Sequence, residues 1–139
     1  MCDPPDCAFT GPAAVALEVT NLAAWTLTLV FLFIELFAPM TWSAFIFLGA
    51  FGLGAVMSLV LLILYAIALC GFGATSPARS GLTIGVAMAT ANFVIAWVTG
   101  FAFGYAVVAN VAFSVTGVIM ARRIRVTLLG QPAGAGLLA

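Results

Sequence analysis

The sequence predicts an all-α integral membrane protein that folds as a bundle of four transmembrane helices. The first observation is composition: 65% of the 139 residues are hydrophobic and 6% are charged, whereas a soluble domain carries about 25% charged residues. The second is the segment from Ser80 to Ala121, which contains no Asp, Glu, Lys or Arg. One helix of that length would be about 63 Å long. The hydrocarbon core of a bilayer is only about 30 Å thick, so we expect two spans there.

The first two spans cover residues 13–37 and 41–72. Pro39 separates them, because proline lacks the backbone donor that a helix interior needs. Trp42 and Tyr65 are separated by about 35 Å along the second helix, at 1.5 Å per residue. This separation matches the distance between the two membrane interfaces, where aromatic side chains gather. We therefore expect Trp42 at one interface and Tyr65 at the other.

The third and fourth spans are predicted at residues 82–98 and 105–121, and a Gly-, Ser- and Pro-rich loop precedes the third span. The alternative is a total of three spans, in which one long, bent or protruding C-terminal helix replaces these two. Residues 1–12 form a polar N-terminal tail that lacks the basic region of a cleavable signal peptide. Residues 122–139 form a basic interfacial segment followed by a tail rich in Gly, Ala and Pro.

The arginines also favour four spans. Basic residues in short loops favour the cytoplasmic side of a membrane. With four spans, Arg79 lies on the same side as the cluster of Arg122, Arg123 and Arg125, whereas three spans would put it on the opposite side. The four-span prediction places both termini on the cytoplasmic side, which is the matrix or stroma in an organelle.

Two glutamates interrupt the first span, and an ionisable group within a span is a functional candidate. Glu18 and Glu35 are about 25 Å apart along a helix, so they cannot act together on one substrate. One hypothesis is a proton or cation relay. The other is that both are interfacial carboxylates with polar partners. We expect an arginine within ion-pair reach of Glu18 and a hydrogen bond between Glu35 and Asn110. The arginines themselves are candidates for ion pairs or lipid headgroup contacts.

Glycines are frequent in the apolar segments, and two pairs have the small-xxx-small spacing that permits close helix packing in lipid. They are expected to contact helices of this bundle or of another subunit. The candidate packing residues are Gly49, Gly52, Gly54, Gly81, Gly85, Gly100 and Gly104.

No catalytic residue and no metal site is predicted. The chain has no histidine, which is the commonest general base and the usual haem ligand. Its three cysteines, Cys2, Cys7 and Cys70, are too few for a metal site without histidine. No cofactor is required. Bound lipid is expected, and a quinone or a pigment at an interface, ligated by an asparagine side chain, stays open. The candidate asparagines are Asn21, Asn92 and Asn110.

The function expected from these features is that of a non-catalytic accessory or assembly subunit of a larger membrane complex. An energy-transducing complex, respiratory or photosynthetic, is one such case. Its partners would be other membrane subunits and lipids, and the formal net charge of zero gives no attraction for nucleic acid. One alternative is a small homo-oligomeric, proton-coupled transporter or channel that uses Glu18. Another is a membrane-organising or viral membrane protein.

Overall fold

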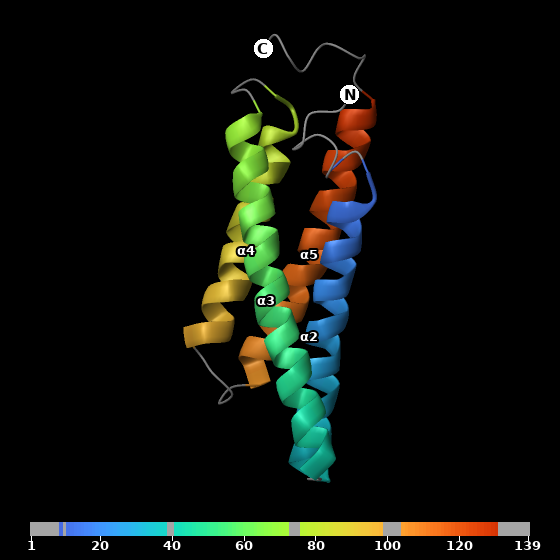
Figure 1. Cartoon of the computed structure of the whole chain (residues 1–139), viewed down its shortest axis with the longest axis vertical. Coiled ribbons are helices and arrows are strands. Elements are labelled where there is room, and N and C mark those ends of the chain that lie inside the picture. Colours follow the sequence, from blue (N-terminus) through green and yellow to red (C-terminus); the bar gives the residue numbers. More distant parts are fainter. Residues whose placement is uncertain (1–8, 10, 39–40, 73–75, 99–103, 131–139) are drawn as a thin grey trace.

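A computed structural model describes residue 9 and residues 11–38, 41–72, 76–98 and 104–130. Within these residues the protein consists of four helices, and all four are long and apolar enough to cross a membrane. They are α2 (Ala13–Phe37), α3 (Thr41–Gly71), α4 (Arg79–Val98) and α5 (Gly104–Leu129). The predicted four-helix membrane bundle is therefore confirmed. The three-span alternative is wrong, because α4 and α5 are separate antiparallel helices (Figure 1).

The helices form a closed, up-and-down ring. α2 packs against α3 and α5, and α4 packs against the same two helices. α3 has 31 residues and α4 has 20, or about 46 Å and 30 Å of helix. The α2–α3 hairpin therefore extends beyond the α4–α5 end of the bundle (Figure 1). α3 is therefore longer than the hydrocarbon core of a bilayer, which is about 30 Å thick.

The ends of the predicted spans shift in the structure. α5 continues without interruption through the arginine cluster to Leu129, eight residues beyond the predicted end of that span. α4 begins at Arg79, whose guanidinium Nη1 donates a hydrogen bond to the carbonyl of Phe72 at 3.1 Å. A cation in this position stabilises the carbonyl end of a helix, so Arg79 ties the end of α3 to the beginning of α4.

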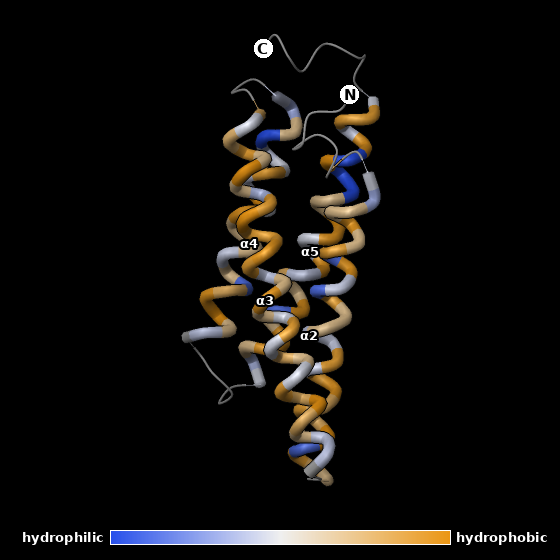
Figure 2. Tube along the Cα trace, viewed as in Figure 1, coloured by the Kyte–Doolittle hydropathy of each residue, from blue (hydrophilic) through white to orange (hydrophobic). Residues whose placement is uncertain are grey.

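Buried residues recur at alternating steps of three and four along every helix, as in a left-handed bundle. On α4, for example, the buried positions are Leu82, Gly85, Ala89, Asn92 and Ala96. The opposite side of each helix forms the outer surface of the bundle and is apolar. Its exposed side chains include phenylalanines, leucines, isoleucines and valines. Figure 2 shows the apolar character of each helix, with hydrophilic positions at the end that holds the start of α4 and the end of α5, midway along the bundle and at the tip of the α2–α3 hairpin.

Polarity is thus reversed relative to a soluble bundle. Among the described residues, eight polar or charged side chains are buried, while large apolar side chains face outward. This arrangement is stable where lipid surrounds the helices and no water is available to the interior groups. The buried polar residues are Glu18, Asn21, Thr28, Ser43, Ser58, Asn92, Asn110 and Ser114.

Candidate functional site

The candidate functional site is the polar core at the centre of the bundle. One polar side chain from each helix meets there. Asn21 of α2 donates from Nδ2 to the Ser114 hydroxyl of α5 at 3.1 Å, and Asn92 of α4 donates to the same hydroxyl at 3.1 Å. Ser58 of α3 donates to Asn21 Oδ1 at 3.2 Å and also to the carbonyl of Gly54 at 2.8 Å. Asn21 and Ser114 are therefore the junctions of a network that joins all four helices.

Glu18 lies one turn from this network, on the same face of α2 as Asn21. Its side chain is 3% exposed, and its Oε1 accepts a hydrogen bond of 2.8 Å from the Tyr65 hydroxyl of α3. The backbone of α5 leaves room for the carboxylate at Gly117, where a Cβ atom would lie 2.5 Å from Glu18 Oε2. Glu18 is thus an interior carboxylate held between α3 and α5.

Tyr65 is packed on every side. The ring is 0% exposed, and the Phe9 ring lies against it with 5.3 Å between centroids. Its other face lies on α4 at Gly85, where a Cβ atom would be 2.5 Å from Tyr65 Cε1. Tyr65 does not face the lipid as an interfacial aromatic side chain would, because its position on α3 turns the ring towards the bundle axis. Its depth in the membrane stays a prediction. Trp42, in contrast, is 57% exposed.

Each glutamate has a hydroxyl partner in the structure. Among the described residues, Glu18 accepts a hydrogen bond from Tyr65. The inward positions of α5 near Glu18 are Gly117 and Ala121, whereas Arg122 and Arg123 are exposed and Arg125 is half-buried. The ion pair between Glu18 and an arginine therefore stays a prediction. Glu35 accepts a hydrogen bond from the Ser43 hydroxyl across the α2–α3 hairpin, not from Asn110.

The remaining candidates are the glycines and cysteines, and the glycines differ in what surrounds them. At Gly54, Gly81 and Gly85 an added Cβ would lie 2.5–2.9 Å from side chains of neighbouring helices, so these glycines serve packing within the bundle. Gly104, at the start of α5, faces Leu32 at 3.5 Å. At Gly49 and Gly52, a Cβ would meet nothing within 4 Å. Gly100, Cys2 and Cys7 lie outside the described residues, and Cys70 is an exposed free thiol.

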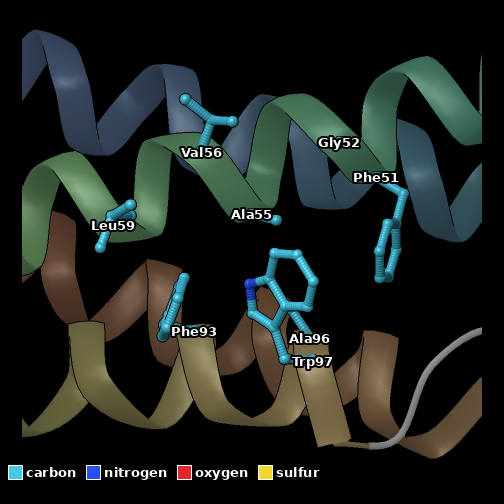
Figure 3. Close-up of a pocket in the computed structure, with 8 residues that line it drawn as sticks. All are labelled: Phe51, Gly52, Ala55, Val56, Leu59, Phe93, Ala96 and Trp97. Carbon is cyan, nitrogen blue, oxygen red and sulfur yellow. The ribbon is translucent and has the colours of Figure 1, made fainter.

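The described helices also line cavities away from the polar core. A groove of about 460 Å³ opens between α3 and α4 and is lined by apolar side chains (Figure 3). The rings of Phe93 and Trp97 project into it from α4, opposite Gly52 and Ala55 of α3. A second cavity of about 310 Å³ lies between the start of α4 and the end of α5, with Arg123 among its lining residues. Neither cavity is lined by Glu18.

Sequence reasoning missed three members of this site: Gly117, Ser58 and Ser114. The available signal was the spacing of polar residues on the first helix, where Glu18, Asn21 and Thr28 share one face. In the described part of the chain, no three His, Cys, Asp or Glu side chains gather as a metal site. Comparison of the chain with protein-family models, curated proteins and solved structures finds no match.

Proposed function

We propose that the protein is a non-catalytic subunit of a larger membrane complex and that it binds its partner through the outer face of α3 and α4. The observation that carries this proposal is the outward orientation of Gly49 and Gly52. In lipid, helices associate where small residues let their backbones approach closely. Gly54 and Gly85 allow neighbouring helices to approach closely inside the bundle. At Gly49 and Gly52, in contrast, no atom of another described residue lies within 4 Å of the position of a Cβ.

The groove beside Gly52 supports the same proposal. It is apolar, and the rings of Phe93 and Trp97 form one of its walls, 6.1 Å apart between centroids. Aromatic side chains around a small-residue surface are suited to hold a partner helix. Acyl chains of bound lipid, or a quinone or pigment at the seam, fit the apolar lining as well.

Gentle detergent extraction followed by mass spectrometry of the co-purifying chains tests the proposal. We expect unlike membrane subunits at fixed stoichiometry with the wild type. Gly52→Leu should leave the bundle folded, because its side chain enters open space, and should release the partners. The matched control is Ala112→Leu, which places the same leucine side chain at an exposed position of α5, diagonally across the ring. If Gly52→Leu retains all partners, α3 is not the binding face.

A second function is favoured by a different observation, the interior carboxylate of Glu18. Ionisable residues that face the interior of a membrane bundle mark proton and ion pathways in transporters. We propose, as the alternative, a small homo-oligomeric transporter or channel in which Glu18 carries the coupling proton. In liposomes with the purified protein, Glu18→Gln should abolish pH-driven transport. Transport that continues unchanged in this variant would exclude the coupling role.

We infer an orientation from the arginines. Arg79 at the start of α4 and the cluster in the last turns of α5 lie at the same end of the bundle (Figure 1). Because basic residues favour the cytoplasmic side, this end is proposed to face the cytoplasm, or the matrix or stroma of an organelle. Both termini then lie on that side.

A further inference from the structure

Three buried polar atoms in the middle of the bundle have no hydrogen-bond partner among the described residues. They are the indole Nε1 of Trp25, Oδ1 of Asn92 and Oδ1 of Asn110. Each of these side chains is at least 98% buried. An N–H donor or a carbonyl acceptor that is enclosed by apolar groups requires a partner, because transfer out of water removes its hydrogen bonds.

The helix positions place the three side chains in neighbouring layers of the interior. Asn92 is bonded to Ser114, and Asn110 lies one helical turn before Ser114 on α5. Trp25 packs in a cluster with Ala96, which is one turn beyond Asn92 on α4, and with Val111, the neighbour of Asn110. The indole also covers Gly54, where a Cβ would lie 2.8 Å from the ring. The three atoms therefore belong to adjacent interior layers, directly below the network of Asn21 and Ser114.

The chemistry of this set matches water. A water molecule donates two hydrogen bonds and accepts up to two, and buried waters in proteins make about three. One water can donate to the two amide oxygens of Asn92 and Asn110 and accept from the indole N–H of Trp25, which makes three such bonds. A metal cation would satisfy the two amide oxygens but would face the positive end of the Trp25 N–H dipole, which disfavours it. A water in this position also continues the polar core, since Asn92 already bonds to Ser114.

We propose that the bundle binds an ordered internal water between Trp25, Asn92 and Asn110. This site goes beyond the proposed subunit function, because it concerns the interior and not the outer face. It extends the polar core by one layer towards the end opposite the arginines. The hydrogen-bonded network would then reach from Ser58 and Asn21 through Ser114 to the Trp25 indole.

The test uses the indole N–H of Trp25 as the reporter. The chain has three tryptophans, and Trp42 and Trp97 face outward. The full-length protein is labelled with ¹⁵N-tryptophan and placed in nanodiscs of deuterated lipid. Trp42→Phe and Trp97→Phe each remove one indole resonance, so the remaining resonance belongs to Trp25 without any change to the core. We expect a nuclear Overhauser cross-peak between this proton and water, with the sign of a long-lived bound molecule.

Two variants test the placement of the water. Asn110→Leu removes one acceptor and fills its space, and it should abolish the water cross-peak at Trp25. Thr28→Val is the matched control: its hydroxyl is bonded to the carbonyl of Ala24 at 2.8 Å, and its loss removes a nearby exchangeable proton without touching the three atoms. The cross-peak should survive in this control.

Several results would overturn the proposal. A sharp Trp25 resonance without a water cross-peak in the wild type excludes the bound water, and this measurement does not depend on any core variant being folded. A cross-peak that persists in folded Asn110→Leu, or disappears in Thr28→Val, contradicts the placement. A Trp25 shift that changes when sodium and potassium are replaced by choline would identify a cation as the ligand instead.

Discussion

Replacing Gly85 with alanine should destabilise the bundle, because a Cβ atom there would overlap the ring of Tyr65. The new atom would lie 2.5 Å from Cε1, 2.6 Å from Cδ1 and 2.9 Å from Cζ. The ring cannot move aside easily: it is fully buried, bonded to Glu18 and in contact with Phe9. Overpacking of this kind costs about 1–3 kcal/mol.

The control is Gly52→Ala, where the added Cβ meets nothing within 4 Å. Alanine is favoured over glycine in a helix by about 1 kcal/mol, and this contribution is common to both variants. The difference between them therefore isolates the contact with Tyr65. We expect Gly85→Ala to be less stable than Gly52→Ala by about 1–3 kcal/mol.

Unfolding by sodium dodecyl sulfate in mixed micelles, followed by far-UV circular dichroism, measures this difference. In a Tyr65→Leu background the ring atoms are gone, so Gly85→Ala should lose most of its cost, and a double-mutant cycle reports the coupling. Equal midpoints for Gly85→Ala and Gly52→Ala would refute the reasoning, as would a cost that is unchanged when the Tyr65 ring is absent.

Three further predictions concern the polar core and the topology. Tyr65→Phe removes the hydroxyl that donates to Glu18 and should destabilise the protein by about 1–3 kcal/mol, measured by the same unfolding titration. An unchanged midpoint would show that the bond contributes nothing. Ser114→Ala leaves two amide donors without their acceptor, whereas Ser58→Ala leaves one amide acceptor without its donor. Because an interhelical hydrogen bond contributes about 0.6 kcal/mol, Ser114→Ala should lower the free energy of unfolding more than Ser58→Ala by about that amount. The reverse order would contradict the network. The topology is tested with three single-cysteine variants, Ser80→Cys, Thr127→Cys and Ala38→Cys, in oriented vesicles. A membrane-impermeant maleimide should label the first two from one side of the membrane and Ala38→Cys only from the other. Any other grouping would contradict the four-span topology.

The number of spans could be predicted from the sequence because it depends on length and charge alone. The segment from Ser80 to Ala121 is too long for one span, and it is divided as expected, with α4 ending at Val98 and α5 beginning at Gly104. The number of spans also places Arg79 and the arginines of α5 at the same end of the bundle. These features need no knowledge of which helix faces which.

The polar core depends on helix phase, and apolar composition hides phase in a membrane helix. Where both faces of a helix are apolar, the usual contrast between an inner and an outer face is lost. Tyr65 illustrates the difficulty: its distance from Trp42 suggested an interface, while its steps of four from Leu61 and three to Ala68 place it in the interior stripe. Its partner Glu18 is 47 positions away along the chain, a separation that no local pattern reveals.

The arrangement of the buried polar residues explains how a chain without a hydrophobic contrast can specify one packing. Lipid tails solvate leucine as well as a protein interior does, so apolar burial does not decide which face of each helix turns inward. Asn21, Ser58, Asn92 and Ser114 decide it, because each has its partner on another helix and would be unsatisfied in lipid. Rotation of any one helix by a single residue separates at least one of these pairs. Helix phase, and with it the outward position of Gly52, therefore follows from the polar core.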